Sequence, residues 1–553
     1  MTTRNPQKVI SNSEPKFTVL DPRGQQTSIE FIPLAPRLKD LNGKTICIID
    51  SFAPSEKNAS GMENMFHKII PEELKKRFPN ANVIFKESNT GHLSEDPVLM
   101  KQIHDDNVSA YIYGTTTATT LVSTAFIFVS TRFEKKGLPG MVLVFDAFDS
   151  VAKFSQNTYG CPVRYTTIPY PETSMTQKQI TKAIDSIVSN LVAPLTTAEI
   201  RTGTYSPPKY ARVLTTGNLD EIQRYFYEQG MSDGFPIIPP TQDKVSAMLN
   251  HTSRKPDEVL AKVFPPWNLE EVTVEKVAVN GVMAGCEPEH MPVLLAIVEA
   301  YLKAGGGGLA TSTNSFTFML VINGPIRNQL NMNGSYGALG GMNKANATIG
   351  RAVKLFVINL GGGKMGINMM PTIGNVANNS FCFPENEEQS PWVPFSVDQG
   401  FKPGDNTLTF FSQGWAHTGN YGFGGFIEVA KDMAQFEYPM GATILMSPGR
   451  INYLKDSTGK VTMTKEEIID YLWKNALLPL GEYKSNHYYN ALISPRIASG
   501  EVTMEDLDQP DSTPFRVYGK KNIWIVVVGG NSAPMMQAWQ IGRPVTVSID
   551  KWQ

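Results

Sequence analysis

Cysteine is scarce in this chain. Its 553 residues include four cysteines at widely separated positions, namely Cys47, Cys161, Cys286 and Cys382. Such spacing contains no CxxC pair, which excludes a zinc knuckle or a dithiol redox motif. So few thiols in so long a chain are typical of proteins kept reduced rather than crosslinked by disulfides. The seven histidines are equally scattered and form no HExxH sequence, so we expect no metal site.

Charged residues and long apolar runs are also under-represented. Only 18% of the residues are charged and the net charge is −2, so no basic surface for nucleic acid is indicated. No apolar run approaches the length of a membrane-spanning helix. The first residues lack the apolar core of a signal peptide. We therefore expect a cytoplasmic protein that neither spans a membrane nor binds nucleic acid.

Apolar residues make up 41% of the chain, and glycine (45) and proline (38) are plentiful. A chain of this length predicts two or three domains with substantial cores. We expect an N-terminal arm over residues 1–40, an α/β domain over 41–195, a linker over 196–215 and an α+β domain over 216–553. A subdivision of the last domain near residue 400 is possible from the pattern.

Apolar strands alternate with helical patterns in the first domain. Strands are predicted at residues 45–50, 82–86, 109–113, 141–146 and 163–168. Helices are predicted at residues 61–78, 96–105, 118–136, 150–158 and 176–191. This alternation predicts an α/β fold with a doubly wound parallel sheet covered on both faces. Ligands of such sheets bind beyond the carboxyl ends of the strands.

The rhythm changes in the second domain, where helices and strands are irregularly spaced. Helices are predicted at residues 219–229, 242–249, 274–282, 288–304 and 345–358. Strands are predicted at residues 318–323, 408–411, 443–446 and 523–528. Glycine-rich turns separate these elements, and none has the complete sequence of a phosphate-binding loop. We expect no nucleotide or other cofactor.

A hydroxyl-rich turn follows one predicted strand of the first domain, from Gly114 to Thr120. It connects that strand to the predicted helix 118–136. Helix N-termini have unpaired backbone N–H groups and bind carboxylates or phosphates. The pattern predicts an anion-binding loop whose threonines contact the substrate, namely Thr115, Thr116, Thr117, Thr119 and Thr120. The alternative is a threonine cap with β-branched packing.

Further polar side chains follow the other predicted strands of this domain. They are Asp50, Ser51, Lys86 and Asp146. Lys86 could neutralise a substrate carboxylate, and Asp50 or Asp146 could accept a proton. The alternative is that the aspartates and the serine cap the following helices. Because carboxyl ends of parallel strands share one edge of a sheet, these groups are predicted to converge there.

Residues 109–171 resemble the UGSC family of bacterial (seleno)proteins, named for a Sec-Gly-Ser-Cys signature. The matching features are Gly114, the segment Glu134–Pro139, the strand end Asp146–Phe148 and Gly160-Cys161-Pro162. The resemblance extends over about residues 40–195. It implies a fold of the aspartate/glutamate racemase type, with a reactive residue on the threonine loop.

Within this resemblance, Thr116 stands where the selenocysteine or cysteine would be, and Thr119 where the final cysteine would be. A threonine hydroxyl is a far weaker nucleophile than a thiolate. We therefore expect the loop to bind substrate. The second domain resembles an uncharacterised bacterial family found alongside such proteins, in blocks at residues 232–241, 278–289, 345–351 and 381–392.

Two cysteine-containing segments of the second domain are candidates for catalysis. Cys286 precedes a predicted helix beginning at Pro288, whose dipole would lower the pKa of the thiol. The alternative is a buried, inert cysteine. Glu385 follows Cys382 in a run of three carboxylates, a composition that can divide acid and base roles. A solvated surface is the alternative for this run.

Two further segments of the second domain carry polar groups. His417 lies in a sequence rich in Gly and Asn, which predicts a loop histidine available for catalysis. Asn343 and Lys344 begin a predicted helix and form a second candidate anion site.

These features predict a cofactor-independent enzyme acting on a small anionic metabolite that contains an amino or thio group. We expect a lyase or proton-transfer reaction where the two domains meet, in a chain that could form homo-oligomers. One alternative is a thiol-dependent transferase or oxidoreductase that uses Cys286. Another is a non-catalytic binding or scaffold protein with a degenerate first domain.

Overall fold

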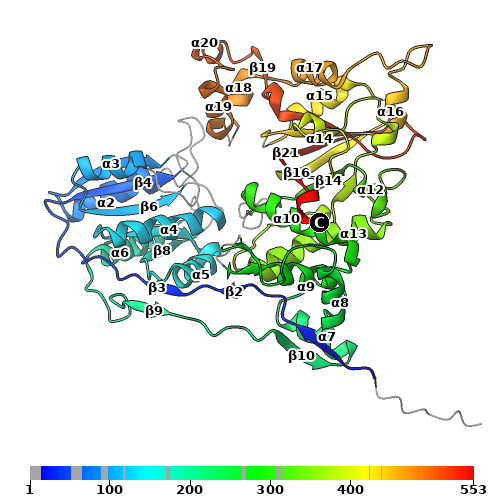
Figure 1. Ribbon diagram of the computed structural model, residues 1–553. Helices are drawn as coiled ribbons and strands as arrows, with labels where there is room; N and C mark the ends of the chain where they lie inside the picture. The colour runs from blue at the N-terminus through cyan, green and yellow to red at the C-terminus, as the bar shows by residue number, and fades with distance from the viewer. Residues whose placement is uncertain are drawn as a thin grey trace, which may run out of the picture.

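The computed structural model describes residues 14–51, 65–88, 97–115, 120–169, 175–262, 264, 269–306, 312–313, 315–422, 424–437, 439–486 and 489–553. Figure 1 shows a smaller α/β part, blue to cyan, beside a larger part that runs from green to red. A mixed α/β architecture with two differently built sheets is therefore confirmed.

The smaller part contains a five-stranded parallel sheet with the order β5-β4-β6-β7-β8. Its strands are β4 (Thr45–Ser51), β5 (Asn82–Ser88), β6 (Ala110–Thr115), β7 (Gly140–Phe145) and β8 (Tyr165–Ile168). Its helices are η1 (Met65–Ile69), α2 (Ile70–Arg77), α3 (Pro97–Asp105), α4 (Thr120–Lys135), η2 (Asp146–Phe148), α5 (Asp149–Tyr159) and α6 (Gln177–Val192). All five predicted strands are confirmed to within a few residues at each end.

Local sequence explains these elements. All six residues of β7 are buried, as expected for a strand covered on both faces. Helix α6 begins with a capping box, in which Thr176 and Gln179 bond each other's backbone N–H groups. Helix α5 ends at Gly160, whose φ of 64° is the left-handed conformation that glycine adopts without strain.

The strand order places a topological switch at the centre of this sheet. The chain passes from β4 to β5 on one side and then returns to β6 on the other side of β4. In doubly wound sheets, ligands bind in the crevice at the carboxyl ends of the two strands that flank such a switch. Here Asp50 is in register with Gly114, and Ser51 with Thr115.

The N-terminal segment connects the two parts. Strand β1 (Phe17–Leu20) pairs with β10 (Val213–Gly217), β2 (Gln25–Gln26) with β12 (Leu269–Glu270), and β3 (Ile29–Phe31) with β9 (Gly203–Tyr205). The buried side chains of β1 belong to the core of the larger part, whereas Leu34 belongs to the core of the smaller part. In Figure 1 this segment and the strand-containing segment 203–217 run along both parts.

The larger part is built around a mixed six-stranded sheet with the order β15-β14-β16-β21-β17-β20. Its strands are β14 (Met319–Asn323), β15 (Cys382–Pro384), β16 (Thr407–Tyr421), β17 (Ala442–Met446), β20 (Ile523–Val527) and β21 (Met536–Ser548). Two further short pairs are β11 (Val259–Ala261) with β13 (Val272–Thr273) and β18 (Leu477–Pro479) with β19 (Pro514–Arg516). The main sheet combines strands from both sides of residue 400.

The helices of this part precede, separate and follow the strands of that sheet along the chain. They are α7 (Leu219–Glu228), α8 (Gln242–Leu249), α9 (Val274–Ala284), η4 (Pro288–His290), α10 (Met291–Lys303), α12 (Ile326–Gln329), α13 (Lys344–Leu355), η5 (Phe356–Leu360), η6 (Val376–Asn379), η7 (Glu387–Gln389), α14 (Phe395–Asp398), α15 (Phe426–Ala434), α16 (Pro448–Asn452), α17 (Lys465–Asn475), α18 (Leu480–Lys484), α19 (Tyr489–Ala498), α20 (Met504–Leu507), η8 (Lys520–Asn522) and η9 (Asp550–Trp552). In the described residues, no helix is both long and apolar enough to cross a bilayer.

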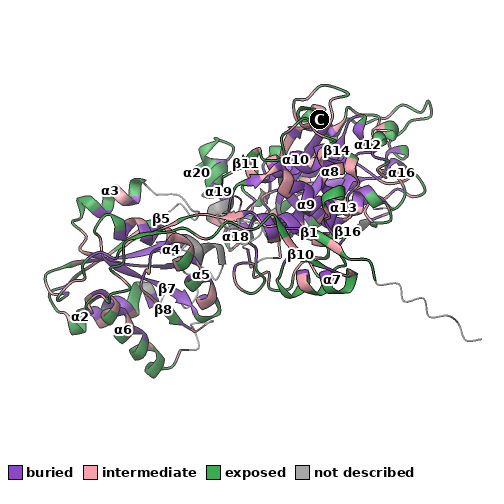
Figure 2. Cartoon of the chain, turned by 60° about the horizontal axis from the view of Figure 1, so that its bottom comes forward, coloured by how far each residue is buried: buried purple, intermediate pink, exposed green. Residues whose placement is uncertain are grey.

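The sheet is curled, and its two faces build different cores. Alternate residues of β14 point to opposite faces, so Leu320 and Ile322 join the core formed with α9 and α10, while Met319 and Val321 join a core inside the curl. The end of β15 reaches the end of β20, where the Asn386 backbone N–H donates to the Val527 carbonyl over 2.8 Å. Figure 2 shows buried residues concentrated around α9, α10 and β14.

Candidate functional site

An aspartate and a histidine meet at the switch point of the parallel sheet. Asp50 is the penultimate residue of β4, and its side chain is only 1% exposed. His67 Nε2, from η1, lies 3.4 Å from Asp50 Oδ2. The imidazole stacks on Phe85 of β5, with ring centroids 5.0 Å apart. A carboxylate that orients a partly exposed imidazole is an arrangement suited to general acid–base chemistry.

The structure brings together several residues predicted from the sequence at this edge. Asp50, Ser51 and Thr115 lie side by side through the β4–β6 register. Asp146 follows β7 at the same edge and is exposed. Thr120 is the first residue of α4. The predicted binding residues Thr116, Thr117 and Thr119 lie outside the described residues.

Lys86, predicted to neutralise a substrate carboxylate, forms an ion pair within the protein. Its ammonium Nζ lies 2.6 Å from Asp106 Oδ2. Asp106 lies in the loop between α3 and β6, so this ion pair links that loop to strand β5. The cation expected to meet a substrate carboxylate is therefore already paired with a carboxylate of the protein.

His67 is the residue of this site that the sequence did not reveal. It lies on the helix predicted after the first strand, and nothing in its immediate sequence distinguishes it. The one available signal was its place near the start of the helix that follows the strand bearing Asp50. Whether such a histidine reaches the strand end depends on how the helix is rotated, which the three-dimensional packing decides.

Two motifs of the family resemblance hold the N-terminal segment in place. Glu134 is buried and accepts hydrogen bonds from the Ala35 backbone N–H at 2.7 Å and from Arg37 Nη1 at 2.9 Å. Gly160 bonds Ile32 through its carbonyl, and a Cβ at Gly160 would collide with the Glu30 carbonyl oxygen. These motif residues therefore have a structural role, because they hold residues 30–37 of the N-terminal segment against this part.

Residues 18–197 match the model of the UGSC family. This part of the chain is a UGSC-like domain. The match starts in β1 and ends just after α6, so it includes most of the segment expected to be a separate arm. No curated protein matches the chain.

Outside the UGSC-like domain, Cys286 was predicted to be activated by the helix that follows it. Its side chain is buried, and burial raises the pKa of the thiol to about 12. The adjacent His290 is buried as well, accepts a hydrogen bond from the Glu287 backbone N–H, and has its pKa lowered to about 4 by burial. Desolvation is the largest cause of this shift and acts against the effect expected from the helix dipole.

The predicted anion site at Asn343 and Lys344 is occupied by groups of the protein. Asn343 caps α13 by accepting a hydrogen bond from the Asn346 backbone N–H at 3.0 Å, and its amide donates to the Asn331 carbonyl. The Lys344 ammonium forms an ion pair with Glu287. Both side chains therefore have structural partners that a ligand would have to displace.

Glu385 is buried rather than part of a solvated surface. Its Oε2 accepts hydrogen bonds from Asn323 Nδ2 and from the Phe395 backbone N–H, both at 2.6 Å. Burial raises the pKa of its carboxyl group. The neighbouring Glu387 and Glu388 instead bind the guanidinium of Arg327 at 3.1 and 3.0 Å. The run of carboxylates thus separates into one buried acid and two ion-paired groups.

The segment around His417 is a strand and not the loop predicted from its glycines. Residues 407–421 form β16, and His417 is in register with Trp539 of β21. Irregularities in the β16–β21 register accommodate the glycines. The side chain of His417 lies outside what the structure describes.

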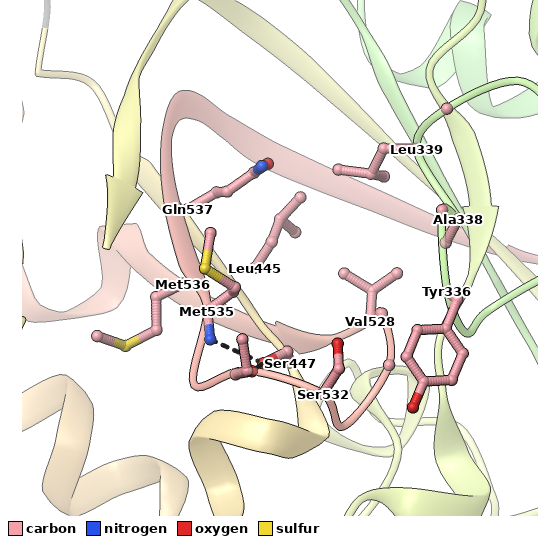
Figure 3. Close-up of a pocket in the computed structure, with 15 residues that line it drawn as sticks. Tyr336, Ala338, Leu339, Leu445, Ser447, Val528, Ser532, Met535, Met536 and Gln537 are labelled. Carbon is pink, nitrogen blue, oxygen red and sulfur yellow. Dashed lines mark hydrogen bonds between the residues drawn. The ribbon is translucent and has the colours of Figure 1, made fainter. Parts of the chain in front are cut away.

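Among the described residues, the second domain forms the two pockets described next, and none of the predicted site residues lines either of them. The first, shown in Figure 3, has a volume of about 300 Å³ and lies beyond the ends of β17 and β20. The second is wider, about 880 Å³, and includes Glu388 and Trp392. In the described part of the chain, no three His, Cys, Asp or Glu side chains are grouped so as to hold a metal ion.

Proposed function

We propose that this protein is an enzyme that transfers a proton on a small anionic metabolite, with His67 as the acid–base group. The observation that carries this proposal is the Asp50–His67 contact at the switch point of the parallel sheet. Asp50 would hold one imidazole nitrogen, leaving the other to exchange a proton with substrate. A lyase or racemase-type reaction on an amino- or thio-containing acid fits such chemistry.

The start of α4 supports the choice of an anionic substrate. This 16-residue helix begins at Thr120 and follows β6, whose last residues are in register with Asp50 and Ser51. The N-terminus of a helix of this length favours carboxylates through its unpaired N–H groups and its dipole. The proposal includes the fold of the aspartate/glutamate racemase type that the family resemblance implies.

The contact between the two domains supports a site located where they meet. The Ser150 hydroxyl, at the start of α5, donates to the Gly366 carbonyl of the second domain at 3.4 Å. Met370 of the same segment packs against the core of the UGSC-like domain. Segment 364–370 thus approaches the edge of the sheet that carries Asp50 and Asp146, and Figure 1 shows this edge turned toward the second domain.

Hydrogen exchange at carbon tests this proposal directly. The purified full-length protein is incubated in D₂O with a panel of small amino and thio acids, and loss of each α-proton signal is followed by ¹H NMR. A proton-transfer enzyme exchanges the α-proton of its substrate. His67→Gln and Asp50→Asn are expected to slow this exchange by about 10²–10⁴-fold.

A second His–Asp pair in the same domain provides a matched control. His104 Nδ1 lies 3.5 Å from Asp105 Oδ1 on the exposed surface of α3. His104→Gln should leave exchange unchanged. Equal rates in His67→Gln and wild type would contradict the proposal. Binding of a panel member without exchange would favour the non-catalytic alternative, and activity lost only in Cys286→Ser would favour the thiol-dependent one.

A further inference from the structure

The pocket in Figure 3 is formed by two loops that close over one end of the curled sheet. One loop spans residues 334–341 and the other residues 529–535, and between them lie Leu445 and Ser447 at the end of β17. Leu445, Val528 and Ala338 belong to the core inside the curl. The pocket is therefore an opening into that core, a common location for small-molecule sites.

Two hydrogen bonds join these loops to each other. The Gly529 backbone N–H donates to the Gly334 carbonyl at 2.9 Å, and the Tyr336 hydroxyl bonds the amide oxygen of Asn531. The Tyr336 ring also covers Gly530, where a Cβ would collide with it. These contacts hold the two loops together, and a preformed pocket lowers the entropic cost of binding.

The lining combines apolar side chains with the uncharged polar groups of Tyr336, Ser447, Ser532 and Gln537. Among the described residues, no Asp, Glu, Lys, Arg or His side chain lines this pocket. Figure 3 shows Leu339, Leu445 and Val528 directed toward its centre. The Ser447 hydroxyl is already used, because it donates to the Ala533 carbonyl and accepts from the Met535 backbone N–H. The Ser532 hydroxyl, at the exposed rim, has no hydrogen-bond partner in the described part of the chain.

We propose that this pocket binds a small uncharged organic molecule with an apolar body and one polar end. Its apolar body would replace water against Leu445, Val528 and Met535, and its polar end would bond the Ser532 hydroxyl at the rim. A charged ligand would lose its hydration without meeting an opposite charge, which is costly. This site is separate from the Asp50–His67 pair and does not depend on the chemistry proposed there.

A series of probes that differ only in charge tests the proposal. Indole-3-acetamide, indole-3-acetate and tryptamine share one ring system and are neutral, anionic and cationic. Titration of the full-length protein carrying ¹³C-methyl methionine is followed by NMR, with the Met535 resonance assigned through Met535→Leu. The neutral probe is expected to shift the Met535 resonance and to bind at least tenfold more tightly than either charged probe.

Two tryptophan variants separate this pocket from the wider one. Ser532→Trp fills the rim and should weaken binding of indole-3-acetamide at least tenfold, whereas Asn452→Trp, in the wider pocket, should have no effect. If Ser532→Trp does not fold, the shift of the Met535 resonance in the wild-type protein still shows whether the neutral probe binds in this pocket. Equal or tighter binding of indole-3-acetate, or a neutral probe that leaves the Met535 resonance unmoved, would overturn the proposal.

Discussion

The buried carboxyl group of Glu385 has an unusual environment. Its Oε1 and the Asn323 Oδ1 are both buried without a hydrogen-bond partner, while Glu385 Oε2 accepts from Asn323 Nδ2. A proton on Glu385 would let these two groups satisfy each other as an acid–amide pair. Burial raises the pKa of this carboxyl, which favours the same protonated form. We infer that Glu385 stabilises the fold as a neutral acid.

The protonated acid predicts a pH-dependent effect of Glu385→Gln. Because the pKa of Glu385 is raised in the folded state, its contribution to stability is complete below the pKa of the unfolded chain and is lost as the pH rises through the folded value. The amide of glutamine imitates the neutral acid and does not titrate. The variant should match wild type in melting temperature near pH 4 and exceed it increasingly toward pH 8, measured by calorimetry.

A lower melting temperature of Glu385→Gln at pH 8 would show that the carboxylate form is needed for the fold. Loss of α-proton exchange in a stable Glu385→Gln protein would instead restore the catalytic role expected from the sequence.

At the scale of single elements, the start of α10 depends on a neutral histidine. His290 Nδ1 accepts a hydrogen bond from the Glu287 backbone N–H at 3.2 Å, which closes the turn that precedes the helix. Burial lowers the pKa of His290 to about 4. As the pH falls from about 6.5 to 4, the unfolded chain gains a proton that the folded chain excludes, so stability falls over this interval.

His290→Asn removes this titration while keeping an acceptor near the same position. Between pH 7 and pH 4.5, the wild-type protein should lose up to about 3 kcal/mol more unfolding free energy than the variant. Urea unfolding followed by the fluorescence of the second domain measures this difference. Parallel losses in both proteins would show that His290 titrates normally in the folded state.

The accuracy of the sequence predictions also differs between elements. The strands of the UGSC-like domain were predicted because each is a short, continuous apolar run between polar turns. Strand β21 was missed because polar residues, Gly542 and Pro544 interrupt its apolar pattern, although the strand pairs along its length with β16 and β17. Its burial between two neighbours, and not its own propensity, makes it a strand.

Only the part of the candidate site that follows from the strand order could be predicted from the sequence. Parallel topology brings Asp50, Ser51 and Thr115 to one edge wherever helices alternate with strands, so this grouping was predictable. The Asp50–His67 contact depends on the rotation of one helix, and the pKa of Cys286 depends on how much of the fold covers the thiol. Local sequence reveals neither the rotation of the helix nor the burial of the thiol.

At the scale of the whole molecule, the N-terminal segment contributes to both cores. Leu20 is 2% exposed in the core of the second domain, and Leu34 is 4% exposed in the core of the UGSC-like domain. Leu20→Ala and Leu34→Ala should each cost about 2–5 kcal/mol, since both remove a buried leucine. Leu20→Ala is expected to destabilise the second domain, and Leu34→Ala the UGSC-like domain.

Hydrogen exchange monitored by mass spectrometry locates these losses. Leu20→Ala should increase exchange in α9 and α10, and Leu34→Ala should increase it in β6 and β7. Each variant serves as the control for the other, because both make the same chemical change within one short segment. If both variants increased exchange in the same elements, the two domains would unfold as one unit.

The pairing of β1 with β10 has a consequence for synthesis on the ribosome. Phe17 leaves the ribosome early, but its partner Gly217 is made only after the entire UGSC-like domain. That domain can therefore complete its sheet while β1 still lacks both its partner strand and the helices that bury Leu20. Until then the emerging chain carries an unpaired apolar strand, the kind of segment that chaperones recognise and that promotes association between nascent chains.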